Sequence, residues 1–345
     1  MVSTDVSVII PCRNERSTIE QVLEDLHAQT FLGKMEVIVA DGCSDDGTRE
    51  ILDEISRSDR YRYPLRVITN EHRIIPSALN RAVEASSGRV IVRVDGHSRV
   101  PQTYVAEIVN ALATTGADVV GPRVRFVPGS ASPVAFAIAT LQASVFGTGG
   151  TASRRSISRP VRVAHAVMSC YNRAVWERVG GYDESLLTNE DFDFDYRATR
   201  TGIVVNALPS PVFSLLARPT LGGLFSQRWR YGWWKAAVII KHPASVHLRQ
   251  IIPVAALLLF VALAILSFLT PVYAIALIAV VYGYVGLSSC AALLALVPVV
   301  LSEVEADGRK ILATMLLAPF IFAIIHGVWA TGVVCGLLFG SRQRS

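Results

Sequence analysis

Cysteine is scarce in this sequence and never has the spacing of a metal site. Cys12, Cys43 and Cys170 lie far apart in the first half, and Cys290 and Cys335 lie in apolar stretches near the C-terminus. An odd number of dispersed cysteines argues against a disulfide framework. We therefore expect free thiols, as is usual in a reducing compartment.

Two common phosphate-binding motifs are absent as well. No Gly-x-Gly-x-x-Gly follows the first strand-like segment, and the sequence Gly-Lys-Ser does not occur. These absences remove the main support for a Rossmann dinucleotide site or a P-loop. A nucleotide, if one is bound, must be held by other groups.

The N-terminus lacks the features of a secretion signal. Residues 1–5 have no basic start, and no apolar core or small-residue cleavage site follows them. We therefore expect the first 250 residues to remain on the cytoplasmic side of the plasma membrane.

Charged side chains are missing from three long stretches near the C-terminus, which raise the mean hydropathy to +0.41. No Asp, Glu, Lys or Arg occurs in residues 251–270, 272–301 or 311–340. About 20 apolar residues cross the hydrocarbon core of a bilayer, so we expect three transmembrane helices. The alternative is a large soluble helical core.

Basic residues precede the first apolar stretch. They are Arg228, Arg230, Lys235, Lys241 and Arg249. Positive charge beside a span favours its cytoplasmic side. The net charge of +5 fits a protein on an anionic lipid surface at least as well as one on nucleic acid. We expect a membrane as partner and no nucleic acid.

Strand and helix signals alternate through the first 121 residues. Strands are expected at 6–10, 36–40, 65–69, 89–94 and 118–121, and helices at 17–29, 48–56, 76–86 and 101–114. Such alternation predicts a doubly wound α/β sheet with mostly parallel strands. Ligands bind at the carboxyl ends of the strands in such sheets.

Acidic residues follow these strands. Asp41, Asp45 and Asp46 share the turn after the second strand, and Asp95 ends the fourth. Carboxylates at strand ends can bind a ribose or base, or hold a divalent ion beside a diphosphate. A solvated surface turn is the alternative for the first group.

The motifs on these turns resemble those of family 2 inverting glycosyltransferases, which have the GT-A fold. Residues 8–15 (Val-Ile-Ile-Pro-Cys-Arg-Asn-Glu) are similar to the opening strand and turn of that family, and residues 39–48 to its nucleotide-binding turn, with Ala40 in place of the first acid. The resemblance implies a nucleotide-diphosphate sugar donor, with a UDP-sugar favoured. It implies that Asp41 contacts the donor, with Pro11, Arg13, Glu15 and Arg73 nearby. Asn70 and Asn80 are the two candidates for the asparagine that precedes a helix in this family.

Asp95-Gly96-His97 stands where the family carries its Asp-x-Asp metal motif. The resemblance implies that Asp95 binds ribose or metal, and that His97 ligates a divalent cation, Mg²⁺ or Mn²⁺, since imidazole accepts first-row metals. A site completed by water is the alternative. Succinoglycan-type exopolysaccharide glucosyltransferases with C-terminal membrane helices are the subgroup most similar to this sequence.

Two adjacent acids, Glu190 and Asp191, resemble the family's Glu-Asp segment. Inversion requires a base that deprotonates the attacking hydroxyl, and the resemblance gives this role to Asp191. Paired acids can raise one another's pKa, which suits a base near neutrality. The alternative is an acidic cap on a helix that ends near residue 201.

Two further segments are candidates for acceptor or diphosphate binding. Gln227, Arg230 and Tyr231 resemble the Gln-x-x-Arg-Trp motif of processive synthases, with Tyr in place of Trp; a basic, aromatic interfacial helix is the alternative. Arg154 and Arg155, on a basic loop over 147–162, are candidates for holding a polyprenyl diphosphate, and a solvated loop is the alternative.

The sequence thus predicts a membrane-bound hexosyltransferase that acts once on a lipid-linked saccharide in polysaccharide or glycolipid synthesis. We expect a GT-A domain over 1–220, an interfacial segment over 221–249 and a membrane domain over 250–341. A sugar nucleotidyltransferase and a catalytically degenerate membrane scaffold are the alternatives.

Overall fold

A computed structural model describes residues 5–58, 60–154, 157–301 and 307–340. The chain divides into two compact units that interleave along the sequence. The first contains Met1–Arg125 and Ala152–Leu215, and the second contains Phe126–Thr151 and Leu216–Ser345. The division at residues 220 and 250 that we expect from the sequence stays a prediction.

The first unit is built on a mixed β-sheet. Its eight strands among the described residues have the order β3-β2-β1-β4-β7-β5-β8-β6. They are β1 (Val6–Cys12), β2 (Met35–Asp41), β3 (Leu65–Thr69), β4 (Val90–Arg93), β5 (Val119–Val127), β6 (Val161–Arg162), β7 (Cys170–Asn172) and β8 (Val205–Leu216). Strands β3, β2, β1 and β4 pair in parallel, whereas β7 pairs antiparallel with β4 and β5. The carboxyl ends of the parallel strands therefore share one edge.

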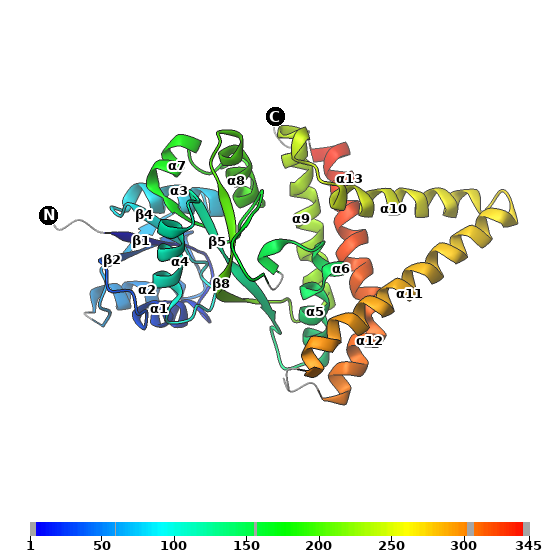
Figure 1. Cartoon of the computed structure of the whole chain (residues 1–345), viewed down its shortest axis with the longest axis horizontal. Helices are drawn as coiled ribbons and strands as arrows, with labels where there is room; N and C mark the ends of the chain where they lie inside the picture. The colour runs from blue at the N-terminus through cyan, green and yellow to red at the C-terminus, as the bar shows by residue number, and fades with distance from the viewer. Residues whose placement is uncertain (1–4, 59, 155–156, 302–306, 341–345) are drawn as a thin grey trace. The chain divides into compact units, whose positions relative to one another are not determined.

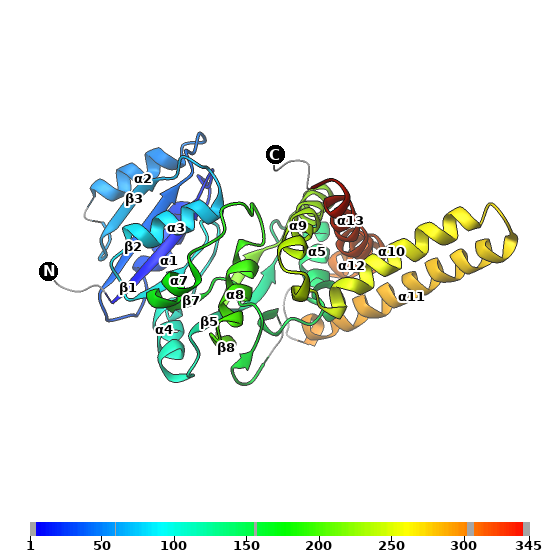
Figure 2. The ribbon, with the colours of Figure 1, turned by 90° about the horizontal axis from the view of Figure 1, so that it is seen from above.

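Helices cover both faces of this sheet (Figures 1 and 2). Helices α1 (Ile19–His27), α2 (Thr48–Arg57) and α4 (Tyr104–Thr114) pack on one face, and α3 (Ile75–Ala85), α7 (Arg173–Val179) and α8 (Glu190–Arg200) on the other. Successive residues of a strand point to opposite faces, so Val8 and Ile10 enter one core and Ile9 enters the other. Apolar residues on both faces explain the continuous runs seen in the sequence.

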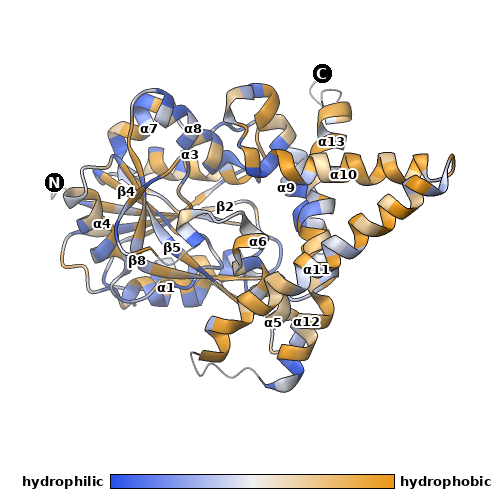
Figure 3. Ribbon diagram, turned by 45° about the vertical axis from the view of Figure 1, so that its right-hand side comes forward, coloured by the Kyte–Doolittle hydropathy of each residue, from blue (hydrophilic) through white to orange (hydrophobic). Residues whose placement is uncertain are grey.

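The second unit is helical. It contains α5 (Pro133–Ala143), α6 (Val145–Thr148), α9 (Leu221–Lys241), α10 (Leu248–Leu266), α11 (Pro271–Leu301), α12 (Gly308–Ala323) and α13 (Trp329–Phe339), with one π-helical turn (Ile324–Val328) between the last two. In the described residues, Leu248–Leu266, Pro271–Leu301 and Gly308–Phe339 are long and apolar enough to cross a membrane (Figure 3). This confirms the three long apolar helices that we predicted.

Helix α5, by contrast, is short and buried within the second unit. Its residues Ile138 and Leu141 are fully buried in a cluster with Ile321 and Phe322 of α12. This short apolar helix is thus covered by a helix from near the other end of the chain.

Glycines bring α9 and α13 into close contact. A Cβ atom added to Gly232 would lie 2.1 Å from the carbonyl oxygen of Trp329, and one added to Gly336 would lie 2.7 Å from the Cβ of Ala236. Small residues spaced four apart allow helix backbones to approach closely. The basic, aromatic helix that we expected at an interface therefore packs along the last apolar helix.

This contact predicts that Gly232→Ala destabilises the second unit by about 1–3 kcal/mol, because overpacking forces backbone shifts. The thermal unfolding midpoint in detergent is the measurement. Gly283→Ala in α11 is the matched control, since an added Cβ there has no neighbour within 4 Å. Equal unfolding midpoints for the two variants would contradict the packing argument.

Candidate active site

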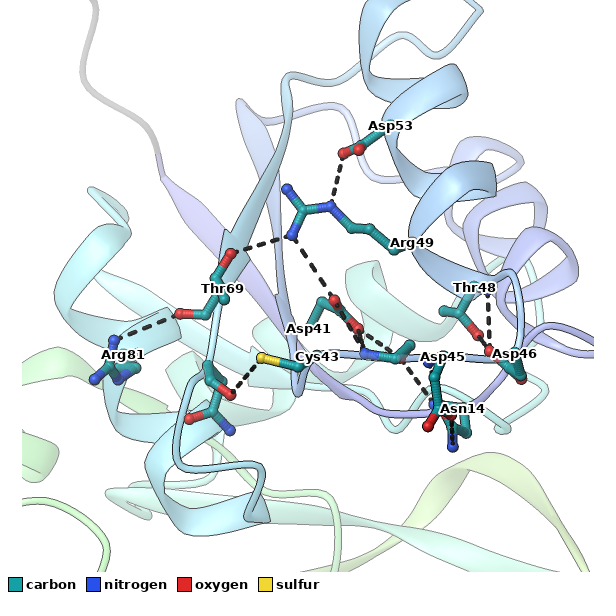
Figure 4. Close-up of polar contacts among 12 residues, drawn as sticks. Asn14, Asp41, Cys43, Asp45, Asp46, Thr48, Arg49, Asp53, Thr69 and Arg81 are labelled. Atoms are coloured by element: carbon teal, nitrogen blue, oxygen red, sulfur yellow. Dashed lines mark hydrogen bonds and ion pairs between the residues drawn. The ribbon is translucent and has the colours of Figure 1, made fainter.

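The turn after β2 is organised around Asp41. Its side chain is 1% exposed, and Oδ1 accepts a hydrogen bond of 2.6 Å from the Ser44 hydroxyl. The Arg49 guanidinium lies 3.8 Å from Oδ2 of Asp41 and also pairs with Asp53 (Figure 4). Because the acid at this strand end is bonded rather than freely solvated, the surface-turn alternative for Asp41 loses its support.

The turn after β1 is fixed to the turn after β2. The amide N–H of Asn14 donates to Ser44 Oγ at 2.9 Å, and its side-chain amide donates to Asp45 Oδ1 at 2.9 Å. The N–H of Glu15 donates to Thr48 Oγ1 at 2.8 Å. The structure thus brings the turn that bears Arg13 and Glu15, directly after Pro11 of β1, against the turn that bears Asp41. It also shows that Asn14, which we did not predict, connects the two turns.

Backbone strain is concentrated at this edge of the sheet. Non-glycine residues with positive φ in the described part of the chain are Asn14, Cys43, Arg73, Met168 and Asn189. The first three follow β1, β2 and β3, Met168 precedes β7, and Asn189 immediately precedes α8. Such conformations cost free energy and gather at functional sites. Their distribution therefore supports a binding site at the strand ends.

Arg73 lies beside Arg13, as the predicted common site requires. The guanidinium of Arg13 donates to the carbonyl oxygen of Arg73 at 3.2 Å. Of the two candidate asparagines, buried Asn70 precedes helix α3, and its side chain donates to Ile74 O at 2.9 Å. Asn80 lies inside α3, and its side-chain amide forms hydrogen bonds with the backbone of Tyr182. The prediction that Asn80 precedes a helix was therefore wrong.

His97 and Glu15 form a pair on this edge. Nδ1 of His97 lies 2.8 Å from Oε1 of Glu15. Asp95 is 24% exposed at its side chain, and its Oδ1 accepts from Nε of Arg93 at 2.8 Å. The described residues contain no group of three or more His, Cys, Asp and Glu side chains placed to hold a metal ion.

Arg93 connects Asp95 to Glu190, and it was not predicted from the sequence as a site residue. Its side chain is 7% exposed, and Nη1 lies 3.1 Å from Oε1 of buried Glu190. An arginine within the apolar strand Val90–Arg93 was the available signal, because a buried cation requires anionic partners. This chain of ion pairs connects the end of β4 to the start of α8.

His165 and Asp195 were also missed. The imidazole Nε2 of His165 lies 3.7 Å from Oδ2 of Asp191, and Nδ1 lies 2.9 Å from Oδ2 of Asp195. Asp191 and Asp195 are four residues apart on α8 and therefore lie on one helix face. That spacing was visible in the sequence, although the histidine partner was not.

The two adjacent acids have opposite pKa shifts. Burial and the neighbouring Asp191 carboxylate raise the pKa of Glu190 to about 7, against the effect of Arg93. Burial alone would raise the pKa of Asp191, but His165, Arg93 and the backbone N–H of Phe192 lower it below its ordinary value. The expected rise from pairing is therefore confirmed for Glu190 and wrong for Asp191.

The acceptor candidates fall in different parts of the molecule. Arg154 ends a 3₁₀ turn in the first unit, and its positive charge lowers the pKa of His165. Gln227, Arg230 and Tyr231 lie on α9 in the second unit, where Gln227 donates to the Tyr231 hydroxyl at 3.5 Å. Arg155 lies outside the described residues.

Comparison with known proteins agrees with this geometry. The family model described as "Glycosyl transferase family 2" matches residues 7–180. The chain is 34% identical over 257 residues to the succinoglycan biosynthesis protein ExoA of Rhizobium meliloti, covering 74% of this chain and 76% of the relative. It is 30% identical over 239 residues to the glycosyltransferase AglE of Haloferax volcanii, covering 66% and 71%.

A solved structure shares the fold. The mannosyltransferase PcManGT from Pyrobaculum calidifontis, in complex with GDP-Man and Mn2+, aligns with a TM-score of 0.54 at 19% identity, over 94% of this chain and 87% of that one. Together with the sheet order, this likeness confirms the predicted GT-A fold.

Proposed function

Because the chain belongs to glycosyl transferase family 2, we propose that it transfers a hexose from a nucleotide-diphosphate sugar to a lipid-linked saccharide, with inversion at the anomeric carbon. The observation that carries this proposal is the chain of contacts from Asp95 through buried Arg93 to buried Glu190, with distances of 2.8 and 3.1 Å. It connects the end of β4, which is suited to binding a diphosphate, to α8, which bears the candidate catalytic base Asp191.

The donor end of the site is formed by the turns after β1, β2 and β3. Asp41 is the proposed contact to the nucleobase of the donor. Pro11 and Glu15 lie on the turn that is bonded to the Asp41 turn. The Arg13 guanidinium lies at the backbone of Arg73, and positive charge from these two arginines would suit the donor phosphates. A UDP-sugar is the favoured donor, and the GDP-Man present with PcManGT makes a GDP-sugar the comparison to test.

Asp95 and His97 suit a divalent cation, Mg²⁺ or Mn²⁺. Such ions are commonly held by one or two protein ligands together with substrate phosphates and water. A histidine whose Nδ1 bonds a carboxylate, as His97 bonds Glu15, offers Nε2 to a metal. When bound, the cation would stabilise negative charge on the leaving diphosphate.

Asp191 is the proposed base. Its side chain is 29% exposed and can meet an acceptor, whereas the Glu190 side chain is 6% exposed and bound to Arg93. Asp191 would take the hydroxyl proton as the acceptor oxygen bonds to the anomeric carbon. The bond from that carbon to the diphosphate oxygen breaks on the opposite face as the new bond forms, and the nucleoside diphosphate leaves with the electron pair.

The acceptor is proposed to be a polyprenyl-diphosphate-linked or other lipid-linked saccharide. Arg154 lies within electrostatic range of His165, and its guanidinium could pair with a diphosphate. Three helices suited to crossing a membrane would keep such a lipid near the enzyme. We place the protein in the plasma membrane with its catalytic unit on the cytoplasmic side, since basic residues precede the first span.

The test is a transfer assay on membranes that contain the protein. Radiolabelled UDP- and GDP-sugars are supplied in turn with Mn²⁺ or Mg²⁺, and label is followed into the lipid extract. We expect label with one donor class, lost on chelation of the metal. Donor binding without any labelled lipid or saccharide would reject the proposed transfer.

For the donor site, Asp41→Asn should weaken nucleotide binding about tenfold or more, because a hydrogen bond to a charged group contributes about 1.5–3 kcal/mol. Isothermal titration with UDP and GDP measures the dissociation constant. Asp53→Asn is the matched control, since Asp53 also pairs with Arg49 but lies outside the turn (Figure 4). Equal affinities for the two variants would remove Asp41 from the nucleotide site.

A further inference from the structure

His165 lies between two carboxylates of α8. Nδ1 lies 2.9 Å from Asp195 Oδ2, and Nε2 lies 3.7 Å from Asp191 Oδ2. The ring also packs edge-on against Phe192, with centroids 5.7 Å apart. The imidazole is therefore fixed on three sides by residues of one helix, although it comes from the segment between β6 and β7.

Asp195 serves as the anchor for this ring. Its side chain is 1% exposed, and Oδ2 accepts a hydrogen bond of 2.8 Å from the N–H of Ala166. A buried carboxylate bonded to one ring nitrogen fixes the orientation of an imidazole and favours its charged form. The other nitrogen then faces Asp191 Oδ2 at 3.7 Å, within ion-pair distance when the ring is charged.

We propose that His165 is a positioning residue for the transfer reaction. Held by Asp195, it carries a positive charge that orients the Asp191 carboxylate and keeps it ionised between turnovers. This inference rests on the proposed role of Asp191 as the catalytic base. It adds His165 and Asp195 as residues that this role requires.

The charges around the ring agree with this role. His165 faces Asp191 and Asp195, with Arg154 within electrostatic range, and Arg93 and Glu190 act on Asp191 as well. Burial and Arg154 lower the pKa of His165, but the two carboxylates outweigh them and the pKa is raised. The ring therefore stays protonated further toward neutral pH than an ordinary histidine, and Asp191 keeps a cationic neighbour.

Loss of the cation at His165 should raise the pH below which activity is lost. A base works only when it is ionised, so activity falls as the pH drops through the lower apparent pKa of the Glu190–Asp191 pair. The cation at His165 lowers that pKa, and its removal raises it. His165→Gln should therefore shift the acid limb of the kcat profile upward by about one pH unit or more.

The experiment measures kcat against pH for the full-length protein in detergent or nanodiscs, together with UDP and GDP affinity. His165→Lys, which keeps the charge, should retain an acid limb close to the wild-type position. His27→Gln at the end of helix α1, which packs on the other face of the sheet, is the control for loss of a histidine elsewhere and should leave the profile unchanged.

Two outcomes separate this inference from the proposed function. An unshifted acid limb in His165→Gln, with Asp191→Asn inactive, overturns the role of His165 alone. An active Asp191→Asn variant overturns the base assignment. If the His165→Gln protein fails to bind nucleotide, Asp195→Asn is tested in its place. Loss of the Asp195 charge should shift the acid limb in the same direction. An unshifted acid limb in Asp195→Asn also overturns the inference.

Discussion

Asp191→Asn is expected to reduce glycosyl transfer about 10²–10⁴-fold, which is the usual contribution of a general base. Asparagine keeps the shape of the side chain but cannot take the acceptor proton. Nucleotide affinity should be nearly unchanged, because the donor contacts are assigned to other residues. The measurement is the initial rate of labelled-sugar transfer at saturating donor, with nucleotide affinity determined in parallel.

Glu190→Gln is the comparison for this variant. Glu190 is buried against Arg93, so its loss should act through the arrangement of the site and reduce the rate less than Asp191→Asn. A near wild-type rate for Asp191→Asn would refute the assignment. If Glu190→Gln were the inactive variant instead, the carboxylic acid with the raised pKa would be the base.

The second large effect is expected on stability. Arg93→Met should reduce the free energy of unfolding by about 3–5 kcal/mol, because it leaves the buried Glu190 carboxylate without its cation. Asp95 loses its partner in the same step. Urea unfolding, followed by the fluorescence of Trp176 in variants without the other tryptophans, measures the change in the first unit.

A double variant tests whether the loss comes from the unpaired charge. Arg93→Met combined with Glu190→Gln removes both charges, and we expect it to be more stable than Arg93→Met alone. The coupling free energy between the two positions should thus be non-zero. Additive losses would show that Arg93 stabilises the fold by packing rather than by its ion pairs.

Much of the fold follows from local sequence patterns. Alternating strands and helices predicted the α/β sheet, and the three uncharged stretches predicted the apolar helices. Asp41 and Glu15, at or just after strand ends, lie on neighbouring turns, because a parallel sheet brings its strand ends together. These features depend on periodicity and chain direction alone.

Residues that act through distant partners could not be found in this way. Arg93 interrupts an apolar strand, and only the fold shows that Glu190, 97 residues later, neutralises it. His165 follows a basic segment and has no local pattern of its own. The pKa of Asp191 was misjudged for the same reason, since its cationic neighbours come from other segments.

The interleaving of the two units has a consequence for evolution and for protein engineering. Helix α5 is encoded between two parts of the catalytic unit, yet its apolar face is covered by α12 near the end of the chain. Deleting the C-terminal helices to obtain a soluble enzyme would therefore expose α5 and favour aggregation. Neither unit is one continuous stretch of sequence, so recombination that exchanges the whole helical unit between related proteins must also carry the segment 126–151.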